Sequence, residues 1–224
     1  MNIVICTHQR LEITSINIES LLGKAHIILV VSTSSEAGYY SRYPIKILIH
    51  PNTPLGAKWQ CGVTEAKNTG GAIMILGSDD ILDSSCIDRY ELLLSQGHDF
   101  IGLSRWWQHY EGTAYLCDYL SQQPLGGARC YSSRLLQQHG SNMFHPKLNS
   151  RLDDQGWKVA RSGLILNEPL VHAIKGNWPV INKFNPFHKN VRILEKRKSV
   201  DILPDVFYKL KYWDKINSTN DDIA

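Results

Sequence analysis

The sequence between residues 72 and 80 reads Ala72-Ile73-Met74-Ile75-Leu76-Gly77-Ser78-Asp79-Asp80. Its first five residues form a continuous apolar run, which is typical of a strand buried on both faces of a parallel sheet. A glycine, a serine and two adjacent carboxylates follow directly. Ligands of open α/β sheets bind beyond the carboxyl ends of the strands. This stretch therefore predicts a central strand with a polar site at its end.

Three more runs, apolar except for Lys46, precede this stretch and have the length of buried strands, at residues 3–6, 27–31 and 45–49. Apolar residues recur at roughly helical spacing between residues 11 and 22, and residues 57–67 are also compatible with a helix. Alternating apolar strands and helices are typical of an α/β fold with a mostly parallel central sheet flanked by helices. The 224 residues have the size of one such domain.

The composition is that of an ordinary globular protein, with 43% hydrophobic and 20% charged residues. The five cysteines are widely separated and have no Cys-x-x-Cys spacing, so they indicate neither a disulfide framework nor a thiolate zinc site. No apolar run approaches the roughly 20 residues of a membrane span, and the chain begins on an apolar strand. From these features we predict a cytoplasmic protein.

Polar residues follow each of the four predicted strands, at positions 7–10, 32–35, 50–52 and 77–80. Because the carboxyl ends of parallel strands meet at one edge, we expect these residues to gather there. The adjacent Asp79 and Asp80 can hold Mg²⁺ or Mn²⁺, since such an ion takes one or two protein carboxylates together with phosphate oxygens. Alternatively, aspartates at this place cap the helix that follows.

Three motifs in the first ninety residues resemble the GT-A glycosyltransferases, particularly their family 2 group. Ile3-Val4-Ile5-Cys6-Thr7-His8-Gln9-Arg10 is similar to that family's first strand and turn. Asn52-Thr53-Pro54-Leu55-Gly56-Ala57-Lys58 is similar to its Asn-x-Gly loop, and Leu76-Gly77-Ser78-Asp79-Asp80-Ile81-Leu82 to its strand-plus-acidic motif. The resemblance implies a single GT-A (Rossmann-like) domain that binds a nucleotide sugar.

The resemblance also implies roles for individual residues. Asp80 would bind the metal ion, Mn²⁺ or Mg²⁺, and Asp79 would help to hold the ribose or the diphosphate. A late histidine is a further metal ligand in several such enzymes, a role open to His172, although a histidine in an apolar strand is more often a hydrogen-bonded core residue. The remaining implied donor-binding residues are Thr7, His8, Arg10, Ser32, Asn52, Gly56, Lys58 and Ser78.

The second half of the chain resembles the family more faintly. Residues 126–134 are similar to the segment that forms the acceptor side, which implies acceptor contacts for Gly127 and Arg129. Residues 152–157 are similar to the acidic pair that supplies the catalytic base, either Asp153 or Asp154. Acidic residues are equally favoured in the first turn of a helix by its dipole.

The aromatic pair Trp106 and Trp107 can stack on an acceptor sugar or base, or fill the core instead. Lys175 and Lys183 can meet the diphosphate or merely water. Family members commonly carry an aspartate pair after the second strand, where this chain has hydroxyl residues, Ser32 among them. Hydroxyls can bind uracil but supply no carboxylate, so UDP is the default nucleotide.

Beyond residue 100 we predict helices at 132–138 and 149–161 and irregular structure over the last fifty residues. Nine Lys/Arg stand against four Asp/Glu between residues 183 and 215. We therefore divide the chain into a domain at 1–182, with a nucleotide-sugar half at 1–100 and an acceptor half at 101–182, and a basic extension at 183–224. The acceptor would be a saccharide, or a hydroxylated DNA base if the basic end contacts nucleic acid.

The resemblance implies transfer of a sugar with inversion, a metal ion at Asp80 and a single base on the opposite face. A nucleotidyltransferase of the same fold is an alternative, although the turn after the first strand, residues 6–10, lacks the glycines of its usual loop. A module that binds nucleic acid without catalysis is a third possibility. The polar residues at the strand ends speak against it.

Overall fold

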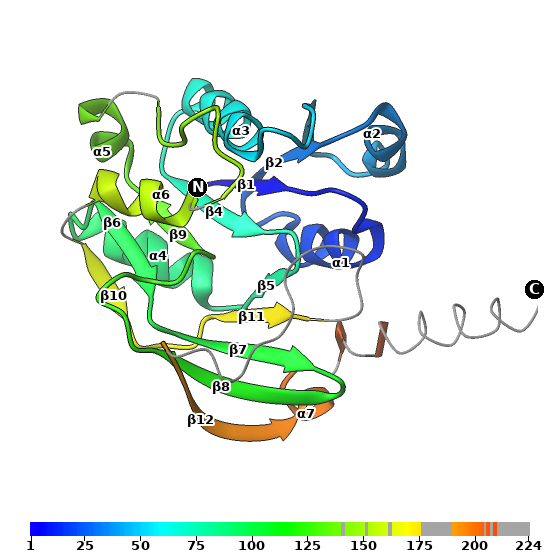
Figure 1. Ribbon diagram of the computed structural model, residues 1–224, viewed down its shortest axis with the longest axis vertical. Coiled ribbons are helices and arrows are strands. Elements are labelled where there is room, and N and C mark those ends of the chain that lie inside the picture. Colours follow the sequence, from blue (N-terminus) through cyan, green and yellow to red (C-terminus); the bar gives the residue numbers. More distant parts are fainter. Residues whose placement is uncertain are drawn as a thin grey trace, which may run out of the picture.

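The computed structural model describes residues 1–139, 142–150, 152–160, 163–175, 190–203, 205–206 and 208–209. These residues form two β-sheets, and helices cover both faces of the larger one (Figure 1). Lys183 and most of the predicted basic extension lie outside the described residues. Within the described part of the chain, no helix is long and apolar enough to cross a membrane.

The larger sheet has the strand order β10-β6-β9-β4-β1-β2-β3. Its four central and edge strands β4, β1, β2 and β3 are parallel, whereas β9 runs antiparallel to β4 and β6. The predicted α/β fold with a mostly parallel sheet is confirmed. The strands are β1 (Asn2–Cys6), β2 (His26–Val31), β3 (Lys46–Ile49), β4 (Ile73–Gly77), β6 (Phe100–Leu103), β9 (Arg129–Tyr131) and β10 (Leu164–Leu166).

Alternate residues of the central strands enter two separate cores. Ile3 and Ile5 of β1 pack in one cluster with residues of α1 (Leu11–Leu21), α2 (Ser34–Tyr40) and α4 (Cys86–Ser95). Val4 packs in the other with residues of α3 (Leu55–Thr69), α5 (Ser133–Gln138) and α6 (Leu152–Ala160). Successive strand residues point to opposite faces, so a fully apolar strand requires helices on both sides.

The smaller sheet has the order β12-β8-β7-β11-β5 and packs beside the larger one (Figure 1). Its strands are β5 (Asp80–Leu82), β7 (Arg105–Tyr110), β8 (Thr113–Tyr119), β11 (Val171–Ile174) and β12 (Val191–Lys198), followed by α7 (Ser199–Ile202). The chain leaves the larger sheet at Gly77 and enters the smaller one at Asp80. The two adjacent carboxylates therefore lie where the sheets meet.

One part of the smaller sheet differs from the sequence-based expectation. Residues 191–198 form a strand along β8, so the prediction of irregular structure was wrong there. The basic residues of this strand, β12, are mostly exposed along one edge of the smaller sheet. The β7–β8 hairpin turns at Glu111 and Gly112, both with positive φ (47° and 76°), as a two-residue hairpin loop requires.

Candidate functional site

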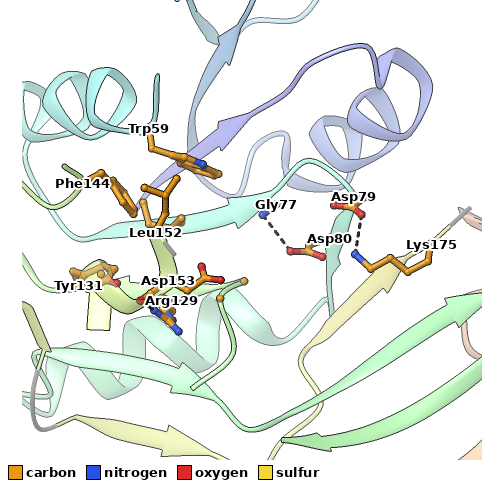
Figure 2. Close-up of a pocket in the computed structure, with 14 residues that line it drawn as sticks. Trp59, Gly77, Asp79, Asp80, Arg129, Tyr131, Phe144, Leu152, Asp153 and Lys175 are labelled. Atoms are coloured by element: carbon orange, nitrogen blue, oxygen red, sulfur yellow. Dashed lines mark hydrogen bonds and ion pairs between the residues drawn. The ribbon is translucent and has the colours of Figure 1, made fainter. Parts of the chain in front are cut away.

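Two adjoining cavities of about 210 and 410 Å³ lie beyond the carboxyl ends of β1 and β4. They share lining residues, among them Trp59, Asp79 and Asp153, and Figure 2 shows the smaller one. Most of the predicted donor-binding residues line the larger cavity, namely Thr7, His8, Arg10, Asn52, Lys58, Ser78 and Asp79. The smaller cavity is lined by Asp80, Gly127, Arg129 and Lys175. Residues from distant parts of the sequence are thus brought together.

Asp79 is buried and paired with two cations. Its carboxylate lies 2.9 Å from a guanidinium nitrogen of Arg10 and 2.9 Å from the ammonium of Lys175. Burial by itself would raise the pKa of Asp79, but the positive charges of Lys175 and Arg10 outweigh it and hold the pKa below its usual value. Asp79 therefore stays ionised and fixes both cations beside the cavities.

Asp80 differs from its neighbour because its carboxylate faces glycines. It accepts a hydrogen bond from the Gly77 amide at 3.2 Å, and a Cβ atom at Gly127 would lie only 2.6 Å from its Oδ2. Burial, and then the nearby charge of Asp79, raise the pKa of Asp80 to about 6. A carboxylate held in this way gains from a nearby cation, since charge on it is otherwise costly.

The Gly126–Gly127 turn separates Asp80 from Asp153. A Cβ atom at Gly126 would lie 2.5 Å from Oδ1 of Asp153, just as one at Gly127 would crowd Asp80. Real Cβ atoms do not approach other atoms so closely, so a side chain at either position would force the facing carboxylate to move. The turn lets two carboxylates from β5 and α6 approach the same stretch of backbone from its two sides.

Asp153 and Asp154 both lie in the first turn of α6 and are exposed. Asp153 lines both cavities, whereas Asp154 is not among the residues that line either of them. Arg129 fastens this turn of the helix to the glycine turn. Its buried guanidinium donates hydrogen bonds to the carbonyl oxygens of Pro124 (2.7 Å), Leu125 (2.5 Å) and Asp153.

Arg129→Met is expected to lower the free energy of unfolding by about 3 kcal/mol, because three carbonyl oxygens would lose a charged donor. Urea unfolding measures the change. Arg134→Met is the matched control, since Arg134 pairs with Asp99 at the surface and such pairs contribute about 1 kcal/mol or less. Equal losses in the two variants would show that Arg129 does not hold the turn.

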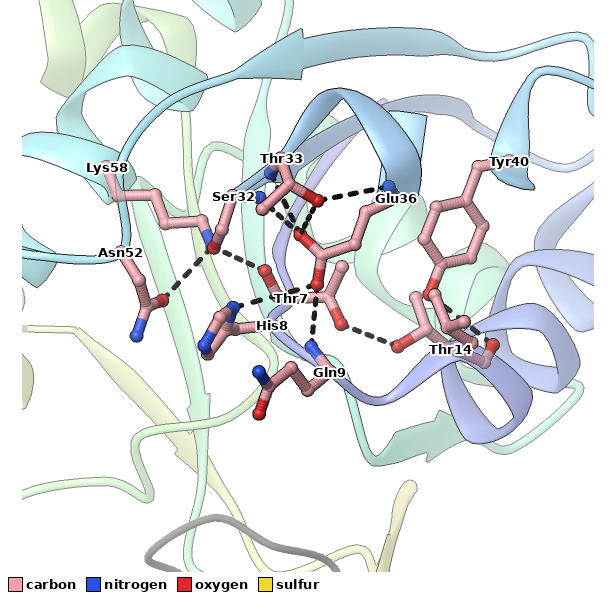
Figure 3. Close-up of polar contacts among 11 residues, drawn as sticks. Thr7, His8, Gln9, Thr14, Ser32, Thr33, Glu36, Tyr40, Asn52 and Lys58 are labelled. Carbon is pink, nitrogen blue, oxygen red and sulfur yellow. Dashed lines mark hydrogen bonds and ion pairs between the residues drawn. The ribbon is translucent and has the colours of Figure 1, made fainter. Parts of the chain in front are cut away.

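Lys58 joins the ends of three strands (Figure 3). Its fully buried ammonium donates to the Thr7 carbonyl, to Ser32 Oγ at 2.7 Å and to Asn52 Oδ1 at 3.2 Å. Burial lowers the pKa of Lys58. All three partners are neutral, so the positive charge of Lys58 adds to that of Arg10 in the electrostatic potential of the larger cavity.

Gly56 holds the start of α3 against the segment before α6. The Gly56 amide donates to the Leu148 carbonyl at 2.8 Å, and the Leu55 amide donates to Asn149 Oδ1 at 2.9 Å. A side chain at Gly56 would collide with the His145 carbonyl. Gly56 therefore acts through packing, and the contact places Asn149 at the rim of the larger cavity.

Glu36 is a carboxylate at the strand ends that sequence reasoning missed (Figure 3). It lies in α2 and folds back to accept hydrogen bonds from the amides of Gln9 (2.7 Å), Ser32 (2.7 Å) and Thr33 (3.1 Å). His8 lies 3.7 Å away. The signal was present, because Thr33 and Glu36 have the spacing of a capping box. A carboxylate thus lies beyond β2 although no aspartate follows that strand.

The remaining predicted residues lie in the smaller sheet, away from both cavities. Trp106 packs in the main core against Tyr119, and Trp107 lies on the opposite face of β7 near Arg197. His172 pairs with Ile81 across β11 and β5, whereas Asp80 pairs with Ala173, so His172 and Asp80 point to opposite faces. Among the described residues, no group of three His, Cys, Asp or Glu could hold a metal ion.

His172 and His109 form a buried pair with 3.2 Å between Nδ1 and Nε2. Burial lowers the pKa of His109 to about 3, helped by His172, and lowers that of His172 to about 4. The unfolded chain binds these protons near pH 6.5, so protonation favours unfolding. The pair therefore makes its full contribution to the free energy of unfolding above about pH 6.5, and this contribution falls as the pH drops from there toward 4.

We expect each histidine of this pair to remove on the order of 2 kcal/mol of stability between pH 7.5 and pH 5. Urea unfolding at several pH values measures the slope. His172→Gln should flatten it, whereas His139→Gln, at an exposed position after α5, should leave it unchanged. A slope that is the same in all three proteins would contradict the buried neutral pair.

No family model and no curated protein matches this chain. Solved structures with a similar arrangement include a protein from Desulfovibrio desulfuricans G20 assigned to the nucleotide-diphospho-sugar transferases (11% identity, 79% of this chain and 81% of that chain, TM-score 0.45). A197 of STIV (8%, 76% and 82%, 0.45) and a nucleotidyl transferase from Methanothermobacter thermautotrophicus (13%, 75% and 88%, 0.47) are others. At these identities and scores, the likeness assigns no activity to the chain.

Proposed function

We propose that this protein is a metal-dependent glycosyltransferase of the GT-A type, which moves a sugar from a nucleotide sugar to an acceptor hydroxyl. One observation carries the proposal. Asp80 and Asp153 approach the Gly126–Gly127 turn from its two sides, beside a cavity lined by cations and hydrogen-bonding groups at the strand ends. This arrangement supports a metal-binding role for Asp80 and the role of base for Asp153 within one site.

The larger cavity suits the nucleoside diphosphate of the donor. Arg10 lines it with a guanidinium, and Lys58 adds a second positive charge from within. Thr7, His8 and Asn52 add hydrogen-bonding groups at its wall. Cationic side chains at the wall of a partly closed site can contact an anionic ligand, and the polar groups orient it. UDP is the nucleotide that we propose first.

Asp80 fits the role of metal ligand better than Asp79 does. Asp79 already contacts Arg10 and Lys175, whereas Asp80 lines the smaller cavity and its charge is poorly compensated. Mg²⁺ is usually bound by one or two carboxylates, with substrate phosphates as further ligands. Asp80 can provide the carboxylate, and the donor would provide the phosphates. Bound there, Mg²⁺ or Mn²⁺ supplies Lewis-acid stabilisation of the leaving diphosphate.

Asp153 is the residue that we propose as the base. It would accept the proton of the acceptor hydroxyl while the hydroxyl oxygen bonds to the anomeric carbon. The bond from that carbon to the diphosphate oxygen breaks, and its electron pair leaves with the nucleoside diphosphate. Arg10 and Lys175, both fixed by Asp79, would stabilise this negative charge. A single base of this kind implies inversion at the anomeric carbon.

A thermal-shift screen tests this proposal directly. Nucleotide sugars with different bases are added with Mn²⁺ or Mg²⁺, and a donor at about 100 times its Kd should stabilise the folded protein by roughly 2.7 kcal/mol. For a chain of this size the melting temperature should rise by roughly 5 to 10 °C. No metal-dependent shift with any nucleotide sugar would contradict the proposal.

A further inference from the structure

An aromatic wall closes one side of the cavity that Asp80 and Asp153 line. It consists of Trp59 from α3, Phe144 from the segment before α6, and Leu152 from the start of α6. The rings of Trp59 and Phe144 have centroids 6.0 Å apart and are tilted by 40°. Phe144 and Leu152 are buried, whereas Trp59 is only half-buried and lines both cavities. Part of the indole therefore remains available to a ligand.

Polar groups lie on other sides of the same cavity. Figure 2 shows the indole of Trp59 on one side and the carboxylates of Asp80 and Asp153 on others. An apolar aromatic surface with a few convergent hydrogen-bonding groups is typical of sites for small ligands. Here the groups suit a ring with apolar C–H bonds on one face and hydroxyls at its edge. Sugar rings have this character.

We propose that the aromatic wall binds the ring of a saccharide acceptor, which stacks on Trp59 and directs a hydroxyl toward Asp153. The role of that hydroxyl rests on the proposed function, whereas saccharide binding at Trp59 does not. Phe144 and Leu152 fix the indole by packing against it, so the platform is formed before the ligand arrives. Trp106 and Trp107 take no part, because neither lines this cavity.

The position of Lys58 is the reason that we assign the wall to the acceptor, although Trp59 and Leu152 also line the larger cavity. Lys58 and Trp59 are neighbours on α3, and neighbouring helical residues point about 100° apart. Lys58 points to the ends of β1 and β2 on the nucleotide side. Trp59 packs toward Phe144, on the side of α6 and Asp153. Two adjacent positions of α3 thus face the two proposed substrates.

Saturation-transfer NMR tests the wall with simple probes, the methyl glycosides of glucose, galactose, mannose and N-acetylglucosamine, each measured beside UDP. We expect saturation of the ring C–H protons of at least one glycoside in the wild type. Trp59→Ala should raise the Kd of that glycoside about tenfold or more, and Trp59→Phe should raise it less, because a smaller ring keeps part of the contact. Tyr208→Ala is the control, since Tyr208 is 77% exposed and lines neither cavity.

Two results would overturn the inference. One is that no glycoside depends on Trp59 in a variant that remains folded by circular dichroism. The other is that Trp59→Ala weakens UDP as much as the glycoside, which would make the wall a platform for the nucleobase. If no nucleotide sugar is cleaved but the glycoside still depends on Trp59, only the proposed function fails. If a nucleotide sugar is cleaved but no glycoside depends on Trp59, only the inference about the wall fails.

Discussion

Asp153→Asn is expected to lower the turnover of sugar transfer by on the order of 10²-fold or more, with donor affinity little changed. An amide cannot accept the proton of the acceptor hydroxyl, whereas its shape is nearly that of the carboxylate. Asp153 lines both cavities and lies against Gly126. The substitution therefore removes a negative charge where the acceptor hydroxyl is proposed to react. Steady-state kinetics with varied donor and varied acceptor separate the two effects.

Asp154→Asn is the matched control for this substitution. Asp154 occupies the same turn of α6 and carries the same helix-dipole interaction, but it is not among the residues that line either cavity. We therefore expect turnover close to that of the unchanged protein. If Asp154→Asn carried the large loss and Asp153→Asn the small one, the assignment of the base would be reversed. Two small losses would place the base elsewhere.

Asp80→Asn is expected to reduce turnover by on the order of 10³-fold and to abolish its dependence on Mn²⁺ or Mg²⁺. A neutral amide is a much poorer ligand for a hard cation than a carboxylate. The variant should fold, since the amide oxygen can still accept the hydrogen bond from Gly77. Metal titrations of turnover and of nucleotide binding measure the loss.

Asp88→Asn is the matched control for the metal site. Asp88 lies in the first turn of α4, exposed and close in sequence to Asp80, but outside both cavities. Its substitution should leave the metal dependence unchanged. Near-normal, metal-stimulated turnover of Asp80→Asn would exclude Asp80 as the ligand and with it this account of the site.

The strand ends of the larger sheet could be predicted from the sequence because the signals there are local. Each strand is a short apolar run, and the parallel order brings Thr7, Asn52 and Asp79 to the same edge whatever the details of packing. The mostly parallel sheet is therefore confirmed. The roles of the residues along this edge remain predictions.

Residues fixed by distant contacts could not be predicted in this way. Glu36 lies in a helix, and only the folded chain shows that its carboxylate returns to the Gln9 and Ser32 amides. Trp59 directly follows residues 52–58, which resemble the Asn-x-Gly loop. Its proposed role depends on the contact with Phe144, eighty-five residues later. His172 was correctly placed in a strand, whereas its direction depends on the register between β11 and β5.

The basic C-terminal strand shows how pairing changes a prediction from charge. Both arginines in β12 contact carboxylates, Arg192 with Asp118 at 2.6 Å and Arg197 with Glu195. Charges paired in this way attract phosphates less than the sequence count suggests. This favours a saccharide acceptor over nucleic acid in our proposal. Binding to duplex DNA that falls steeply with salt would argue for nucleic acid instead.

The products of the reaction test the central claim most directly. The protein is incubated with the nucleotide sugar that gives the largest thermal shift, a saccharide acceptor and Mn²⁺, and the products are identified by mass spectrometry. We predict one nucleoside diphosphate for each glycosylated acceptor, with inverted anomeric configuration. A nucleotidyltransferase would form pyrophosphate from a nucleoside triphosphate and a sugar 1-phosphate. Pyrophosphate from that pair, with no nucleoside diphosphate from any nucleotide sugar, would contradict the account.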